Sequence, residues 1–244
     1  MNATGVFRRS LLLVYLVPLP SEVAVPPGIE GRFLGMQLSH VSISTSAQGT
    51  TTTQIGDNYE MTIRVHNYAR VPPSVLRQAE QAASSVLHES GVHAVWVECA
   101  TVPLAPTEAA CSRPVTPLVL LLNLLPEPMA RHLKLHRDAF GVAAESSEKG
   151  FSFLGSVFYD KVKDCADHER VDLVPLLGSV MAHELGHLLL GTDSHSPSGI
   201  MCASWSGKQI HDIEQRGLSF STSEAKQLQT AVKVRGQAAM IQQD

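Results

Sequence analysis

The sequence has little charge: only 17% of its 244 residues are charged, and the formal net charge is −4. A nucleic-acid-binding protein would show a basic stripe or a high isoelectric point, so we predict no nucleic-acid partner. The apolar run near the N-terminus, residues 11–19, is far shorter than the roughly 20 residues that span a bilayer, which argues against stable membrane insertion. The chain has no internal repeat and no CxxC pair, which excludes a cysteine-based zinc site of the usual spacing.

The N-terminal residues follow the order of a secretory signal. Arg8 and Arg9 precede the apolar run, and small residues follow around Ala24. We therefore predict a signal peptide over residues 1–24 and a secreted or periplasmic location, the alternative being an unstructured tail of a cytosolic protein. Residues 25–60 are rich in Ser, Thr, Gly and Gln and are predicted to form a flexible lead-in.

The four cysteines fit two disulfides if the protein is exported. Cys99 and Cys111 bracket a short proline-containing loop and are the favoured pair. Cys165 and Cys202 would form the second pair. Four free thiols in a reducing compartment are the alternative.

Hydrophobic patterning predicts one α+β core. MTIRVHNYA from Met61 and VHAVWVEC read as strands, separated by a helix that Pro72 and Pro73 open. This βαβ unit favours parallel pairing. LVLLLNLL (118–125) reads as a buried central strand, and AFGVAAES and FSFLGSVFYDKV read as two further strands.

The C-terminal part is predicted to be helical. An apolar helix runs from an Asp172 N-cap to Gly191, and a loop follows through Met201 to about Ser219. A last helix, capped by Ser221 or Thr222, is expected to end at Gly236, leaving a frayed tail over residues 237–244.

The segment HELGH within the apolar helix carries the chemistry. His183 and His187 lie at i and i+4, on one helical face, where two imidazoles can share a metal ion. Glu184 is adjacent and suits a general base. Burying these three groups without partners would cost on the order of 1–3 kcal/mol each, which a metal ion would offset. His195 is favoured as the third ligand, and Asp193 is the alternative.

The stretch from His183 to Met201 resembles the metzincin zinc metallopeptidases, whose signature is HExxHxxGxxH followed by a turn containing methionine. Gly191 lies four rather than three residues after His187, and His195 lies eight rather than six residues after it. Asp193 occupies the usual third-ligand spacing, and Met201 resembles the Met-turn methionine. The resemblance implies a twisted mixed sheet with a long backing helix, an active-site helix and a C-terminal helix after the Met-turn, in a catalytic domain over residues 61–236.

The resemblance also implies an activity. One catalytic Zn²⁺ would activate water, with Glu184 as general base, in a monomeric endopeptidase acting on a peptide or protein substrate. FSFLGSVFYD would be the antiparallel edge strand that pairs with the substrate backbone. Tyr159 is expected to have a structural role, and assistance to the oxyanion is the less favoured alternative.

Two other functions compete with this interpretation. A gluzincin-like peptidase would use a downstream ligand such as Glu214. A non-catalytic, zinc-stabilised peptide-binding protein would not need Glu184. The remaining candidates are predicted to have no metal role: three solvated histidines, a structural histidine and a core tryptophan that could line a pocket, namely His132, His136, His168, His211 and Trp205.

Overall fold

The computed structural model describes residues 60–101, 109–133, 139–144 and 150–241. These residues belong to one compact unit, Thr53–Asp244. The predicted signal peptide and lead-in lie outside the described residues, except for Glu60, which begins the first strand. The proposed boundaries at residues 24 and 60 therefore stay predictions.

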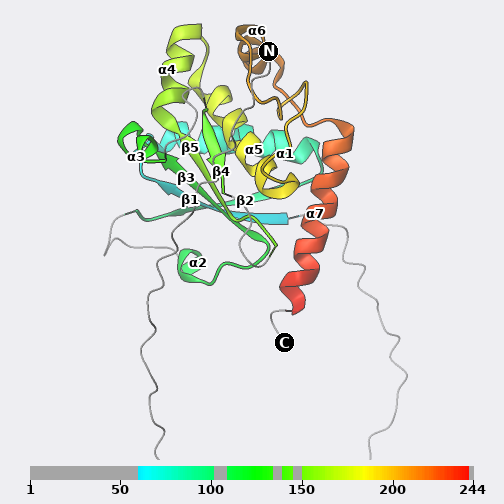
Figure 1. The fold of residues 1–244 in the computed structure, drawn as a ribbon. Coiled ribbons are helices and arrows are strands. Elements are labelled where there is room, and N and C mark those ends of the chain that lie inside the picture. Colours follow the sequence, from blue (N-terminus) through cyan, green and yellow to red (C-terminus); the bar gives the residue numbers. More distant parts are fainter. Residues whose placement is uncertain (1–59, 102–108, 134–138, 145–149, 242–244) are drawn as a thin grey trace, which may run out of the picture. The chain divides into compact units, whose positions relative to one another are not determined.

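The described residues form a five-stranded mixed sheet with the order β2-β1-β3-β5-β4 (Figure 1). Its strands are β1 (Glu60–Asn67), β2 (His93–Cys99), β3 (Val119–Leu125), β4 (Gly141–Ala143) and β5 (Leu154–Phe158). All neighbouring strands are parallel except β4, which pairs antiparallel to β5. The βαβ unit and the central position of β3 are thus confirmed.

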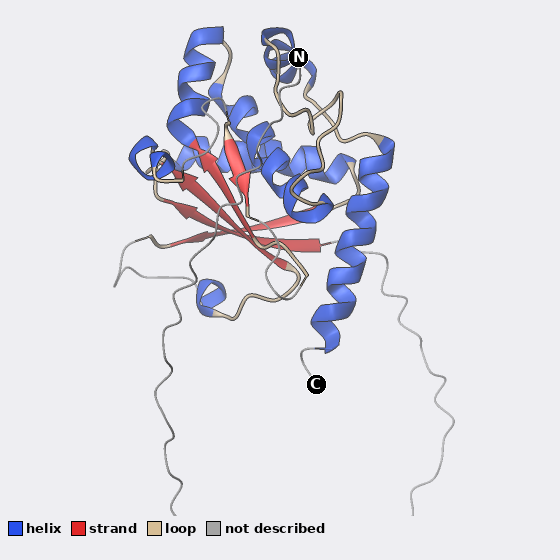
Figure 2. Ribbon diagram, in the orientation of Figure 1, coloured by secondary structure: helices blue, strands red, loops and turns tan. Residues whose placement is uncertain are grey.

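Helices α1 and α5 pack together against one face of this sheet (Figure 2). The apolar side chains that alternate along β1 enter this layer, where Met61, Ile63 and Val65 are each only 1% exposed. The seven helices of the described residues are α1 (Pro73–Glu89), α2 (Ala109–Ser112), α3 (Glu127–Arg131), α4 (Tyr159–Glu169), α5 (Leu173–Leu190), α6 (Gly207–Arg216) and α7 (Thr222–Ile241).

Helix α5 begins and ends at the predicted residues. The Asp172 carboxylate accepts a hydrogen bond from Val174 N at 2.9 Å, and Gly191 ends the helix at φ 112°. Its length and composition would suit a membrane span, but 72% of it is buried inside the structure, as expected for a core helix. The sheet and α1 therefore enclose the helix that carries HELGH.

The segment FSFLGSVFYDKV is not a single strand, and the prediction that it forms the antiparallel edge is wrong. Strand β5 stops at Phe158, and α4 starts at Tyr159. Val162 and Ala166 recur at helical spacing and are buried, so they form the apolar face of an amphipathic helix. The antiparallel edge strand is β4, and β5 lies between β3 and β4.

Two predicted features after Met201 are also wrong. The presumed loop contains α6, whose start has a capping box formed by Ser206 and Gln209. Helix α7 does not end at Gly236 but continues to Ile241, so residues 237–241 of the predicted tail are helical. A single glycine costs only about 1 kcal/mol in a helix, too little to end one by itself.

The cysteine predictions had divided outcomes. Cys99 and Cys111 form a disulfide, as predicted. Cys165 and Cys202 are free thiols, so the second predicted pair is wrong.

Candidate metal centre

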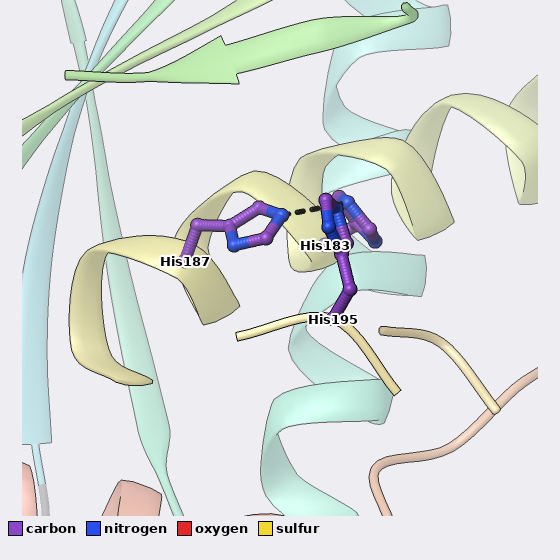
Figure 3. A group of neighbouring side chains, drawn as sticks. All are labelled: His183, His187 and His195. Atoms are coloured by element: carbon purple, nitrogen blue, oxygen red, sulfur yellow. Dashed lines mark hydrogen bonds between the residues drawn. The ribbon is translucent and has the colours of Figure 1, made fainter. Parts of the chain in front are cut away.

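Three histidine rings converge beside α5 (Figure 3). His183 and His187 lie one turn apart on α5, and His195 comes from the loop that follows Gly191. The candidate ligand nitrogens of the three rings all lie within 4.8 Å of one another, and this group can hold one metal ion. The structure thus brings together all three histidines singled out in the sequence.

Backbone carbonyls fix the orientation of the two helical rings. His183 Nδ1 lies 2.7 Å from Ile200 O, and His187 Nδ1 lies 3.2 Å from Gly191 O. A carbonyl oxygen only accepts, so these contacts favour the tautomer in which Nδ1 donates and Nε2 presents a lone pair. The two Nε2 atoms face each other at 3.0 Å. In that tautomer both Nε2 lone pairs are available to one shared cation.

Burial keeps both rings neutral. It lowers the pKa of His183 from 6.5 to about 4 and also lowers the pKa of His187. At neutral pH the rings therefore present metal-binding lone pairs rather than N–H donors. A tetrahedral zinc site with Zn–N bonds of roughly 2.0–2.1 Å separates its ligand nitrogens by about 3.3 Å, close to the observed Nε2 separation.

The two competing third ligands lie outside this group. Asp193 is exposed and is not among the residues that form the group. Its backbone carbonyl accepts from His195 N at 2.9 Å. Glu214 lies on α6, where Oε1 accepts a hydrogen bond from Asp172 N at 3.1 Å. His195 is therefore the residue best placed to complete the set.

Glu184 lies beneath the edge strand. Its side chain is 4% exposed, and Oε2 has no hydrogen-bond partner among the described residues. A Cβ added to Gly141 would lie 2.6 Å from Glu184 Cδ, so the carboxyl group lies directly against β4. Burial raises the pKa of Glu184 to about 8. An unpaired buried carboxyl oxygen is costly and is typical of a functional group.

Met201 packs against α5 at Gly186, between the two histidines of the helix. It is fully buried, and a Cβ on Gly186 would lie only 2.7 Å from its Sδ. Its carbonyl accepts from Ser196 N at 2.9 Å, which ties the methionine to the loop that carries His195. Met201 therefore packs between α5 and this loop, in agreement with a structural role.

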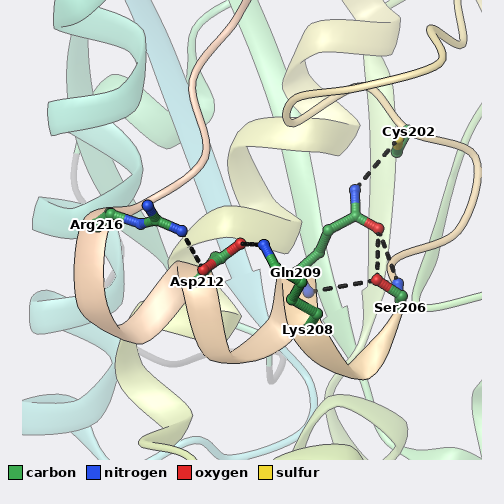
Figure 4. A network of polar contacts seen from close by, with 6 residues as sticks. All are labelled: Cys202, Ser206, Lys208, Gln209, Asp212 and Arg216. Atoms are coloured by element: carbon green, nitrogen blue, oxygen red, sulfur yellow. Dashed lines mark hydrogen bonds and ion pairs between the residues drawn. The ribbon is translucent and has the colours of Figure 1, made fainter.

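Helix α6 supports the same loop from outside (Figure 4). Gln209 donates to Cys202 Sγ at 3.5 Å, and its Oε1 accepts from Ser206 N at 3.0 Å. Trp205 packs edge-on against His183, with ring centroids 5.7 Å apart. Trp205 therefore both packs on the core and borders the candidate metal centre.

Several other residues are placed by the structure. Tyr159 begins α4, and burial raises its pKa. His211 lies on α6, 3.8 Å from a carboxylate oxygen of Glu169. The sequence analysis missed Ser194, whose hydroxyl lies 3.3 Å from His187 Nδ1 and donates to Gly191 O. Its position in the sequence between Asp193 and His195, the two candidate third ligands, could have indicated a role near the metal centre.

Two solved structures resemble this chain distantly. No family model matches the chain, and no curated protein matches it. A zinc-dependent peptidase from Methanocorpusculum labreanum is 16% identical, with a TM-score of 0.45, and the match covers 68% of this chain and 99% of that one. Archaemetzincin from Methanopyrus kandleri is 17% identical, with a TM-score of 0.43, and the match covers 73% and 99%. Likeness at this level assigns no activity to the chain.

Proposed function

We propose that this protein is a zinc-dependent endopeptidase. The observation that carries the proposal is the pair of neutral, carbonyl-oriented imidazoles whose Nε2 atoms face each other at 3.0 Å, next to an unpaired buried carboxyl group. His183, His187 and His195 would hold the metal ion. Three nitrogen ligands with a further position open to water are the usual protein contribution to a catalytic zinc site.

The donor set fits zinc in its chemistry. All three ligands are imidazoles, which suit zinc, and the Nδ1–H groups of His183 and His187 donate to backbone carbonyls. When bound, zinc supplies a Lewis acid that polarises a peptide carbonyl and makes a water molecule a better nucleophile.

Glu184 would act as the general base and then as the general acid. The positive charge of a bound zinc ion would favour the ionised form of this buried carboxyl group. Its free Oε2 would then take a proton from the attacking water and deliver that proton to the leaving amine. The close contact with Gly141 holds the carboxyl group in one position through this cycle. A purely structural metal site would have no use for such a group.

Strand β4 would align the substrate. Backbone hydrogen bonds from Phe158 N to Phe140 O and from Ala144 N to Leu154 O join β4 to β5. Because alternate residues of an antiparallel strand point their N–H and C=O groups to opposite sides, those of Gly141 and Ala143 point away from β5. An extended peptide that pairs antiparallel with this free edge would lie across Glu184.

The disulfide supports the predicted location. Disulfides such as Cys99–Cys111 persist in oxidising compartments. We therefore retain a secreted or periplasmic location and a monomeric peptidase as part of the proposal.

A cleavage experiment tests the proposal. The full chain, loaded with zinc, is incubated with a mixed peptide library, and products are identified by mass spectrometry. We expect internal cleavage by the wild type, and none by Glu184→Gln at equal zinc content. Zinc-loaded wild type that cleaves no peptide would instead favour the non-catalytic binding protein.

A further inference from the structure

A cavity of about 540 Å³ lies at the C-terminal end of α5, the helix that carries His183 and His187. Its walls are residues 150–152 before β5, residues 188–192 at the end of α5, and the face of α7 that carries Val234 and Arg235. Gly191, which accepts the hydrogen bond from His187, is part of the wall. Gly191 therefore connects the cavity wall to the surroundings of the candidate metal centre.

Among the described residues of this wall, Arg235 is the one that is charged. Its Nη2 donates to Leu188 O at 2.7 Å and to Ser152 O at 2.8 Å, and Nη1 donates to Pro117 O at 3.1 Å. All three acceptors are neutral carbonyls, and no carboxylate of the described residues pairs with Arg235. Two of the five guanidinium N–H groups make no hydrogen bond within the described part of the chain.

The surroundings of Arg235 strengthen any interaction with an anion. The side chain is only 3% exposed, and its guanidinium carbon lies 4.9 Å from the ring centre of Phe151. Burial lowers its pKa to about 10, which leaves the group charged at neutral pH. A cation that lacks a counter-charge in such a low-dielectric wall favours a bound carboxylate more than the same cation would in water.

The position of the cavity indicates which part of a substrate reaches it. Glu184 lies against Gly141, at the start of β4. The cavity wall contains residues 150–152, just before β5 begins at Leu154, and Leu154 O accepts a hydrogen bond from Ala144 N just after the end of β4. A peptide antiparallel to β4 runs from Ala143 towards Gly141. Its residues N-terminal to the scissile bond therefore lie on the side of the cavity.

We propose that this cavity binds an acidic side chain of the peptide substrate, on the N-terminal side of the scissile bond, through Arg235. The inference rests on the proposed peptidase function. It adds a preference that neither the motif nor the metal centre specifies.

Blocked peptide pairs provide the test. Each pair carries Glu or Gln at one of the first three positions before the scissile bond, with acetylated and amidated ends so that only one carboxylate differs. We expect kcat/KM to favour Glu by about tenfold at one of these positions, the scale of a charge-assisted hydrogen bond. Equal rates for Glu and Gln at all three positions would overturn the proposal.

Val234 provides a variant that does not disturb the core, because its side chain is 46% exposed at the cavity. Val234→Glu should abolish the preference for Glu by placing a negative charge beside Arg235, whereas Val234→Gln should keep it. An equal preference for Glu over Gln peptides in the two variants would show that Arg235 does not cause the preference.

A binding measurement separates this inference from the proposed function. Calorimetric titration of the same peptides into zinc-loaded Glu184→Gln needs no turnover. Tighter binding of the Glu peptide without cleavage by the wild type would retain the cavity and reject the peptidase. Cleavage without any preference for Glu in rate or in binding would retain the peptidase function and reject the cavity as a site for acidic side chains.

Discussion

Gly141→Ala is expected to lower the proposed peptidase activity sharply without lowering the zinc content. A Cβ at this position would lie 2.6 Å from both Glu184 Cδ and the backbone oxygen of Ser156, about 0.8 Å inside the 3.4 Å at which ordinary contact begins. The backbone of β5 is fixed by its ladder, so the Glu184 side chain or β4 itself must move. Overpacking of this kind costs about 1–3 kcal/mol, and a misplacement of about 1 Å at a reacting group lowers rates by about 100-fold.

Gly155→Ala is the matched control. Its added Cβ would meet Leu122 Cδ1 at 3.3 Å and Glu184 Cβ at 3.6 Å, and neither contact needs more than a small adjustment. We expect kcat/KM to fall by about 10- to 100-fold in Gly141→Ala, with full zinc content and a lower Tm, and to change little in Gly155→Ala. Equal activities in the two variants would refute the placement of Glu184 against β4.

Two further predictions concern stability. Replacing Cys99 and Cys111 together by serine should lower the free energy of unfolding by about 3 kcal/mol, the value for a loop of their separation of 12 residues, measured by urea denaturation; an unchanged midpoint would contradict this. Burial, with a smaller effect of Glu98, raises the pKa of Glu80 from 4.5 to about 7. The folded state therefore binds the proton more tightly, and stability should fall as pH rises from 4.5 through 7, by roughly 1–3 kcal/mol. Glu80→Gln should flatten this part of the pH profile, and an unchanged profile would show that another group causes the loss.

Much of the fold follows from local patterns in the sequence. The period of the apolar residues identified β1, α1, β2 and β3, and cap chemistry at Asp172 and Gly191 identified both ends of α5. These signals succeed because burial and capping act over a few residues.

The errors arose where two local signals competed. The apolar residues of β5 continue into α4, so hydrophobicity alone did not locate the change of element at Tyr159. Helix α6 is short and polar, and its capping box at Ser206 was the missed signal. The free thiols of Cys165 and Cys202 show that an even cysteine count does not establish pairing.

The candidate site was predictable in part. The i, i+4 spacing of His183 and His187 makes their convergence a property of the helix itself. The choice between His195 and Asp193 depends on how the loop after Gly191 turns, which spacing does not specify. Arg235 is distant in sequence, and its place near the end of α5 depends on how α7 packs.

The central claim is that His183, His187 and His195 bind one zinc ion, and a zinc-affinity comparison tests it most directly. Competition with a chromophoric chelator would measure the Kd of the wild type, His195→Ala and Asp193→Ala. We predict one zinc per chain in the wild type, a loss of affinity of at least roughly 100-fold in His195→Ala, and little change in Asp193→Ala. Wild-type affinity in His195→Ala, with the loss appearing in Asp193→Ala, would contradict the account.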